Sequence, residues 1–432
     1  MKNAWWVGSS VGVLVAVGAV IGGGVWVNQT GFGLDHPAPM TVEMPAALFS
    51  PAINSDTTQD AASSPDFEAL TAQLTEQAAD PRLGTFVGVA RDVESGEIVW
   101  EQNQGTAVRP ASATKILTAA VALYELGRED TITTQVLEGE QPGTVVIKAA
   151  GDVTLSEEML DDLAAQLEGQ NIDTVLIDTS IWPDEGFAST WDPIDVDAGY
   201  IADVEPSMIE AGRIGGSEGD LPRSHTPALD VAQALADRIG AETTGTTEIT
   251  TDSTVLASVE SDTLDQRLAR MMEDSDNVMA EGIAKEVAAS KGLPTDSAST
   301  ATMTLDILEG KGFDLSDVSI VDNSGLSFDN LITPRLLDDI LTRAATETEL
   351  RSLLTSLPIA HGTGTLEDRY EGMTGAGWVR AKTGTLTDTS ALAGVVTSES
   401  GRVFTFAFVS NDSAILPARE ALDEMASMLR DF

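Results

Sequence analysis

The stretch "RPASATKILTAA", residues 109–120, places Ser112 three positions before Lys115 at the expected start of a helix. Residues three apart on a helix project from the same face, so the Lys115 amine can reach the Ser112 hydroxyl. That amine can serve as a base only if burial or a neighbouring cation lowers its pKa. The alternative is a serine that caps the helix and a lysine that carries an ordinary surface charge. This stretch alone leaves both interpretations open.

A second polar motif, "SDN" at residues 275–277, interrupts a segment with strong helical periodicity. The Ser275 hydroxyl could relay a proton between a base and a leaving group, and the Asn277 amide could orient Lys115. The alternative is a local turn or helix cap, because serine, aspartate and asparagine all favour such positions.

A third motif, "KTG" at residues 382–384, lies in an expected strand. Lys382 supplies a positive charge, and Gly384 lets a bound chain approach the backbone closely, although an ordinary edge-strand lysine would look the same. The order S-x-x-K, S-x-N, K-T-G is the triplet of penicillin-binding proteins and class A β-lactamases. The chain has seven lysines, and two of them fall in this triplet. We therefore interpret the three motifs as one active site.

Other patterns typical of nucleophiles are weaker. The pattern G-x-S-x-G occurs at residues 8–12, in an apolar run, and at residues 215–219, in a polar glycine-rich stretch. Neither has the strand-turn-helix context of a nucleophile elbow. The chain has three histidines, and His225 and His361 stand in expected loops. A histidine-based triad is therefore disfavoured.

Composition excludes several classes of function. Against 24 Lys and Arg stand 69 Asp and Glu, which gives a formal charge of −45 at pH 7. Such a surface repels polyanions, so we expect no nucleic-acid partner. The chain contains no cysteine, which excludes Cys–His nucleophile pairs and cysteine-ligated zinc. A metal site built from carboxylates alone stays open, although no D-x-D-x-D-G calcium loop occurs.

The N-terminal segment decides the expected location. No charge interrupts residues 3–28, and tryptophans stand near both ends of this run, at Trp5, Trp6 and Trp26. This length and these aromatic residues favour a membrane-spanning helix. A cleaved signal peptide is the alternative, because small residues at 22–24 could precede a cut. Either interpretation places the rest of the chain outside the cytoplasm, anchored to the membrane or secreted.

The rest of the chain divides into a tether and two expected domains. Residues 29–65 are rich in Pro, Ala, Ser, Thr and Asp, which is typical of a flexible linker. Antiparallel strands at both ends of the remaining chain, flanked by helices, predict one split α+β catalytic domain of residues 66–140 and 261–432. The alternation of strands and helices at residues 141–260 predicts an α/β insertion domain.

With these motifs in place, the chain resembles the class C low-molecular-mass penicillin-binding proteins, exported serine-type D-alanyl-D-alanine carboxypeptidases and endopeptidases. "VDNSGLSFDNLITPRLL" (321–337) is similar to that family's D-G-S-G-L-S…N…T-P segment, with Asn323 where glycine is usual. The resemblance runs from about residue 66 to the end. Class A β-lactamases share the triplet but lack the long interval between Ser112 and Ser275. The resemblance implies a split fold like that of the serine β-lactamases, with an insertion shorter than in the fullest members.

The resemblance also implies a mechanism. Ser112 attacks the carbonyl of the terminal D-Ala-D-Ala bond and Lys115 accepts its proton, while Ser275 with Lys382 returns a proton to the leaving amine. Asn277 binds the substrate amide and steadies Lys115. Water then hydrolyses the acyl-enzyme, and no metal or organic cofactor is needed.

Substrate binding is implied by the same resemblance. Thr383 and Thr385, on either side of Gly384, would hold the terminal carboxylate of the stem peptide or of a β-lactam. The backbone N–H groups of Ser112 and Thr385 would form the oxyanion hole. Asp276 is given a structural role. The implied partners are peptidoglycan stem peptides and β-lactam antibiotics.

Two other functions stay open at this point. A β-lactamase or esterase on the same fold would hydrolyse its acyl-enzyme rapidly, and a non-catalytic cell-wall-binding protein would form none. The sequence does not separate carboxypeptidase from endopeptidase activity.

Overall fold

The computed structural model describes residues 66–249 and 253–432. The expected membrane segment at residues 1–28, the expected tether at residues 29–65 and the serine pattern at residues 8–12 lie outside this part. Among the described residues, no helix combines the length and the apolar character needed to cross a membrane.

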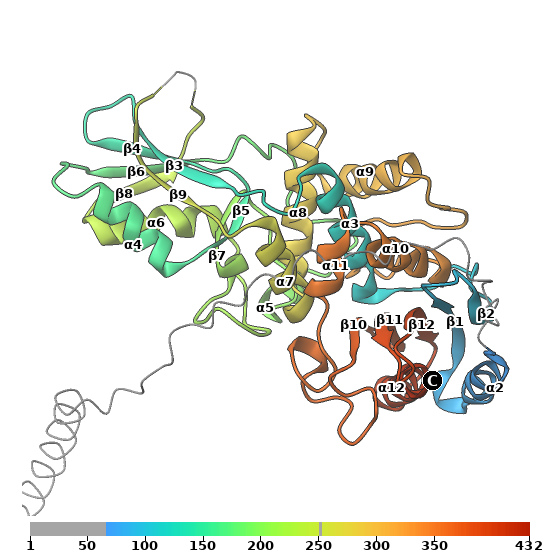
Figure 1. Ribbon diagram of the computed structural model, residues 1–432. Helices are drawn as coiled ribbons and strands as arrows, with labels where there is room; N and C mark the ends of the chain where they lie inside the picture. The colour runs from blue at the N-terminus through green and yellow to red at the C-terminus, as the bar shows by residue number, and fades with distance from the viewer. Residues whose placement is uncertain (1–65, 250–252) are drawn as a thin grey trace, which may run out of the picture. The chain divides into compact units, whose positions relative to one another are not determined.

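Strands from both ends of the chain form one antiparallel sheet, in the order β10-β11-β12-β1-β2 (Figure 1). Strand β1 pairs with β12 over its full length, from Thr85 opposite Asn411 to Asp92 opposite Phe404. The strands of this first sheet are β1 (Thr85–Asp92), β2 (Ile98–Gln102), β10 (Val379–Leu386), β11 (Thr389–Thr397) and β12 (Val403–Asn411). The expected α+β architecture, with an antiparallel sheet built from the two chain ends, is confirmed.

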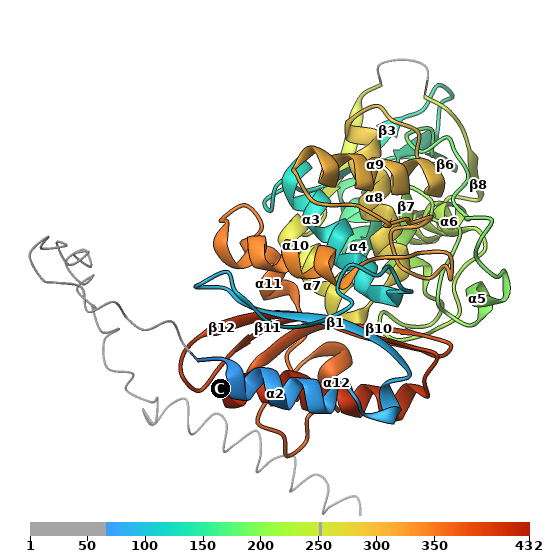
Figure 2. The same cartoon turned by 90° about the vertical axis from the view of Figure 1, so that its right-hand side faces the viewer.

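Helices cover both faces of the first sheet (Figure 2). On one face lie α2 (Glu68–Gln77) and α12 (Ile415–Asp431). Nine residues of the eleven-residue α3 (Lys115–Glu125) are buried, so it is the central helix of the opposite layer. The other helices of that layer are α7 (Leu264–Asp274), α8 (Asn277–Ser290), α9 (Ser297–Gly310), α10 (Pro334–Thr346) and α11 (Arg351–Ser356).

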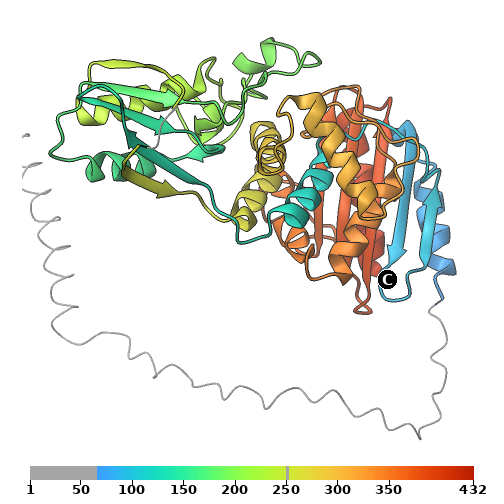
Figure 3. The same cartoon turned by 90° about the horizontal axis from the view of Figure 1, so that it is seen from above.

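The middle of the chain forms a second, mixed sheet with the order β8-β6-β4-β3-β9. The helices α4 (Glu157–Gln166) and α6 (Pro227–Ile239) lie against this sheet (Figure 3). Their leucine, valine and alanine side chains form a separate core with it. Its strands are β3 (Thr133–Glu138), β4 (Thr144–Lys148), β6 (Thr174–Asp178), β8 (Thr243–Thr246) and β9 (Val255–Glu260). The short strands β5 (Asp152–Leu155) and β7 (Ser207–Ile209) pair with each other, and α5 spans Ile194–Asp197.

The expected domain boundaries at residues 140 and 261 stay a prediction. Strand β3 lies before residue 140 and nevertheless pairs with β4 and β9 of the second sheet. Its burial alternates only as far as Val136, and Val136 and Leu137 are both buried, so no local pattern tells which sheet it joins.

Candidate active site

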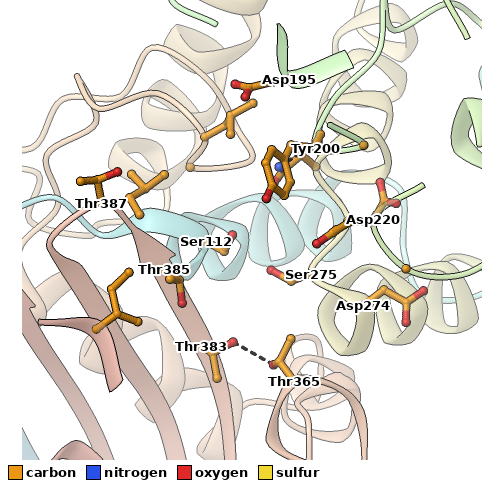
Figure 4. Close-up of a pocket in the computed structure, with 18 of the residues that line it drawn as sticks. Ser112, Asp195, Tyr200, Asp220, Asp274, Ser275, Thr365, Thr383, Thr385 and Thr387 are labelled. Atoms are coloured by element: carbon orange, nitrogen blue, oxygen red, sulfur yellow. Dashed lines mark hydrogen bonds between the residues drawn. The ribbon is translucent and has the colours of Figure 1, made fainter. Parts of the chain in front are cut away.

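A cavity of about 620 Å³ opens beside the edge strand β10, and the three sequence motifs meet there. Ser112, Ser275, Thr383 and Thr385 face this cavity, with Tyr200 on the side away from the strand (Figure 4). The two lysines of the motifs, Lys115 and Lys382, are fully buried behind these serines. The structure therefore brings together residues separated by up to 273 positions in sequence (385 − 112).

Ser112 lies in a 3₁₀ turn, η2 (Ala111–Thr114), which leads into α3. Of the two interpretations that the sequence left open for Ser112, the structure shows the contact with Lys115 and not the helix cap, because no side chain caps η2 or α3. Ala111, the residue before Ser112, has a φ of +48°, a conformation that costs energy for any residue but glycine. The surrounding chain must therefore stabilise the conformation of Ala111, directly before Ser112.

Two glycines allow the chain to pack tightly around this turn. A Cβ atom on Gly384 would lie 2.5 Å from the carbonyl oxygen of Pro110. A Cβ atom on Gly325, whose φ is +84°, would lie 2.0 Å from the carbonyl oxygen of Ala111. Both distances are far below van der Waals contact, so the KTG strand and the loop at residues 322–325 reach the Ser112 turn only because glycine stands at these positions.

The Lys115 amine contacts three oxygens. Nζ donates to Ser112 Oγ at 3.1 Å, to Asn277 Oδ1 at 2.6 Å and to the carbonyl oxygen of Ser324 at 2.7 Å. Complete burial lowers the pKa of Lys115 to about 8, although the negative charges of nearby acidic residues oppose this effect. A substantial fraction of this amine is therefore neutral near pH 8 and able to accept a proton.

Lys382 forms the second lysine–serine pair. Its Nζ donates to Ser275 Oγ at 2.9 Å and to the carbonyl oxygen of Thr383 at 3.1 Å. Burial and the nearby Lys115 hold the pKa of Lys382 well below its usual value. The two serines that face the cavity are thus each in hydrogen-bond contact with a buried amine whose proton is weakly held.

The helix break predicted at Ser275 is confirmed, and its geometry explains how the motif is presented. Ser275 ends α7 in the left-handed conformation, with a φ of +58°. Asp276 then begins α8, because its Oδ1 accepts the backbone N–H of Met279 at 2.9 Å. Asn277 is the first residue of α8, and its Nδ2 donates to the carbonyl oxygen of Tyr200 at 2.9 Å. Both ends of the Asn277 amide are therefore fixed, and its oxygen points at Lys115.

The loop at residues 322–325, to which the sequence assigned no site residue, completes the surroundings of Lys115. Glu281 of α8 is buried, and its Oε1 accepts the backbone N–H groups of Asn323 and Ser324 at 2.9 and 2.7 Å. Burial and the negative charge of Asp322 raise the pKa of Glu281 to about 7. By fixing these two N–H groups, Glu281 positions the Ser324 carbonyl that accepts from Lys115.

Asn323 stands where the resembled family usually has glycine. Its side chain is buried, and both ends of its amide form hydrogen bonds. Its Oδ1 accepts from Thr304 Oγ1 at 2.7 Å, and its Nδ2 donates to Thr300 Oγ1 at 2.9 Å. Both threonines belong to α9. The departure from the family pattern is therefore accommodated inside the helical layer, and Asn323 does not line the cavity.

The remaining candidates lie away from this cavity. Neither His225 nor His361 lines it, and His225 is exposed and contacts Asp197. Ser217, the serine of the 215–219 pattern, is exposed in a loop. Within residues 66–249 and 253–432, no group of three or more His, Asp or Glu side chains is arranged to hold a metal ion.

Comparison with known proteins gives matches over most of the chain. The model of the "D-Ala-D-Ala carboxypeptidase 3 (S13) family" matches residues 70–218 and 218–431. Carboxypeptidase DacB of Mycolicibacterium smegmatis is 41% identical over 393 residues, which cover 85% of each chain. The crystal structure of penicillin binding protein 4 (dacB) from Haemophilus influenzae has a TM-score of 0.68 and 22% identity, covering 83% of this chain and 97% of that one. The same Haemophilus protein complexed with a β-lactam has a TM-score of 0.62 and 21% identity, with the same coverage.

Proposed function

Because the chain belongs to the D-Ala-D-Ala carboxypeptidase 3 (S13) family, we propose that Ser112 forms the acyl-enzyme of a serine-type D-Ala-D-Ala carboxypeptidase. The protein is a low-molecular-mass penicillin-binding protein that acts on peptidoglycan stem peptides. The roles of the individual side chains follow from the contacts around the two buried lysines.

The arrangement around Lys115 carries this proposal. A neutral amine has two N–H groups and one lone pair. The oxygens of Asn277 and Ser324 take the two N–H groups, at 2.6 and 2.7 Å. The lone pair is then directed at the third neighbour, Ser112 Oγ, at 3.1 Å. Lys115 is therefore oriented to accept the Ser112 proton while Oγ attacks the peptide carbonyl.

The second pair supplies the proton that the leaving group needs. As the tetrahedral intermediate collapses, the nitrogen of D-alanine takes a proton from the Ser275 hydroxyl, and Lys382 reprotonates Ser275. The acyl group stays on Ser112 until water hydrolyses it. The same attack on a β-lactam carbonyl opens the ring but leaves its nitrogen tethered, so a slowly hydrolysed penicilloyl-enzyme accumulates.

The test uses the purified full-length chain. We expect it to release D-alanine from an acyl-D-Ala-D-Ala peptide and to carry a stable label after incubation with fluorescent penicillin. Peptide mapping should locate that label on Ser112. Rapid penicillin hydrolysis without an accumulated label would instead indicate a β-lactamase. Absence of both label and D-alanine release would exclude the enzymatic functions and leave the cell-wall-binding one.

The same labelling reaction should depend on pH in a defined direction. Because the pKa of Lys115 is lowered to about 8, its neutral fraction rises about tenfold per pH unit below that value and levels off above it. We expect the second-order labelling rate to follow this curve between pH 6 and 10. A rate that stays constant from pH 6 to 8 would contradict the role of Lys115 as the base. The Lys115→Arg variant, whose guanidinium stays protonated, serves as the comparison.

We also propose that residues 3–28 hold the protein in the cytoplasmic membrane, with the catalytic residues outside the cytoplasm. The uncharged run and its flanking tryptophans support this. A peptidoglycan substrate, which lies outside the membrane, is consistent with it. Full-length protein expressed in bacteria should remain in the membrane fraction after a high-salt wash, and deletion of residues 1–28 should release it. Recovery of a shortened full-activity protein in the soluble fraction would indicate a cleaved signal instead.

A further inference from the structure

The short strand β5 connects two hydrophobic cores of the described chain. Val153 packs in the core to which α3, α7 and α8 contribute, whereas Leu155 packs in the core of the second sheet. Gly282 of α8 allows the strand to come close, because a Cβ atom at this position would lie 3.0 Å from Val153 Cγ1. The second sheet is therefore joined to the helical layer partly through β5.

A small second cavity lies where β5 meets α7 and α8. About 10 Å³ of it is open to the centre of a water molecule, and its charged lining residues are Asp152, Arg267 and Glu286. Asp152 and Arg267 are almost completely buried. A space of this size holds about one water molecule if at least two polar groups are there to bind it. The polar atoms around the cavity therefore decide whether it takes up water.

One acceptor and one donor of these side chains are unpaired. Asp152 Oδ1 accepts the backbone N–H and the hydroxyl of Thr154, both at 2.8 Å, but Oδ2 is buried and has no hydrogen-bond partner within the described part of the chain. Arg267 Nη1 and Nη2 donate to Glu286 at 2.6 and 3.1 Å, and Nη2 also donates to Asp130 at 3.1 Å. Arg267 Nε is buried and, among the same described residues, equally unpaired. Both groups have lost bulk water without a replacement partner, which is costly.

The charges around the cavity favour a neutral occupant. A cation would be repelled by Arg267, and an anion would be repelled by Asp152 and Glu286. Burial raises the pKa of Asp152, although its hydrogen bonds to Thr154 and the charge of Arg267 oppose this effect. A donor at Oδ2 would stabilise the carboxylate further. Water meets these requirements, because one molecule can accept a hydrogen bond and donate another at the same time.

We propose that this cavity binds one water molecule, which accepts a hydrogen bond from Arg267 Nε and donates one to Asp152 Oδ2. The water then links the first residue of β5 to α7, the helix that ends at Ser275. Because Glu286 of α8 holds the other side of the Arg267 guanidinium, the link reaches both helices that flank the SDN motif. This site does not depend on the proposed function, and either can fail without the other.

A crystal structure of the full-length chain, at a resolution that shows ordered water, tests the site directly. We expect one peak of density within about 2.7–3.2 Å of both Arg267 Nε and Asp152 Oδ2. An empty cavity, a direct contact between the two side chains, or an ion in place of water would overturn the proposal.

Thermal unfolding of full-length variants tests whether the bridge holds the two parts together. Asp152→Val removes the acceptor of the water and should lower Tm. The matched control is Thr154→Val, which removes a hydrogen bond to Oδ1 but leaves Oδ2 free to bind the water, and its loss of Tm should be smaller. Asp152→Asn keeps a polar group in the place of Oδ2, so its Tm should lie above that of Asp152→Val.

Equal losses of Tm in Asp152→Val and Thr154→Val would show that Oδ2 takes part in no bridge. If Asp152→Val does not fold, Arg267→Lys replaces it, because lysine keeps the positive charge but lacks the Nε–H donor. This variant should also lose more Tm than Thr154→Val and should show no ordered water at Asp152 Oδ2. A bridging density that persists unchanged in Arg267→Lys would contradict the role of Nε.

Discussion

Replacing Ser112 by alanine should abolish penicillin labelling and lower D-alanine release by on the order of 10⁴–10⁶-fold. The substitution removes the hydroxyl oxygen that contacts the Lys115 amine at 3.1 Å. No other described serine of the cavity can replace it, because Ser275 contacts Lys382 instead. Labelling with fluorescent penicillin and D-alanine release under single-turnover conditions measure the effect.

Ser112→Ala should barely change the stability of the folded protein. Lys115 keeps its hydrogen bonds to Asn277 Oδ1 and to the Ser324 carbonyl, so the free energy of unfolding should change by about 1 kcal/mol or less. Ser217→Ala is the matched control, because Ser217 is the exposed serine of the G-x-S-x-G pattern at residues 215–219. Fluorescent penicillin should label this variant as it labels the wild type. Full labelling of Ser112→Ala, or loss of labelling in Ser217→Ala, would show that the nucleophile has been misassigned.

The catalytic part of the fold was largely predictable, because its elements carry local signals. Short-range periodicity and turn residues predict the helix after Ser112, the break at Ser275 and the KTG strand. Strand β3 shows the limit of such signals. It pairs with β9, more than a hundred residues later, and its sequence pattern fits either sheet.

The site was predictable only where a motif marked it. The lysine–serine pairs come from the S-x-x-K, SDN and KTG motifs, whose residue types are specific enough to recognise together. Glu281 has no such motif, because it acts through hydrogen bonds to the N–H groups of Asn323 and Ser324, which come close to it only in the folded chain. The sequence also left a helix-cap role for Ser112 open, and only the folded structure decides between the two roles: the hydroxyl contacts Lys115, and no side chain caps η2 or α3.

Asp276 shows how a distant segment supports the site. Its Oδ2 accepts from Arg213 Nη2 at 2.7 Å and from Arg223 Nη2 at 2.9 Å, and all three side chains are almost completely buried. Burial favours the neutral acid, but the two guanidinium groups hold the pKa of Asp276 down at about 2. This cluster fixes the residue between Ser275 and Asn277. Its contribution to stability is therefore present above about pH 4 and is lost as the pH falls towards 2.

Replacing Asp276 by asparagine should therefore destabilise the protein and slow acylation together. An asparagine keeps an oxygen for the Met279 N–H, but it leaves the Arg213 and Arg223 charges buried without a counter-charge. Removing one partner of a buried ion pair typically costs about 3–5 kcal/mol, and we expect a loss of that size in denaturant-induced unfolding at pH 7. Because Asn277 then holds Lys115 less firmly, the penicillin labelling rate should fall about tenfold or more.

The control for this substitution is Asp274→Asn, which removes an exposed charge two residues earlier. Its stability should stay within about 1 kcal/mol of the wild type, since exposed ion pairs contribute little. If Asp276→Asn were as stable as this control, the two arginines would not depend on Asp276 for their burial. If it were destabilised but labelled at the wild-type rate, the cluster would stabilise the fold without positioning Ser275 and Asn277. If Asp276 supports the site, Asp276→Asn must lose both stability and labelling rate. The Asp276 side chain connects the segment that carries Arg213 and Arg223 to the motif that holds Lys115.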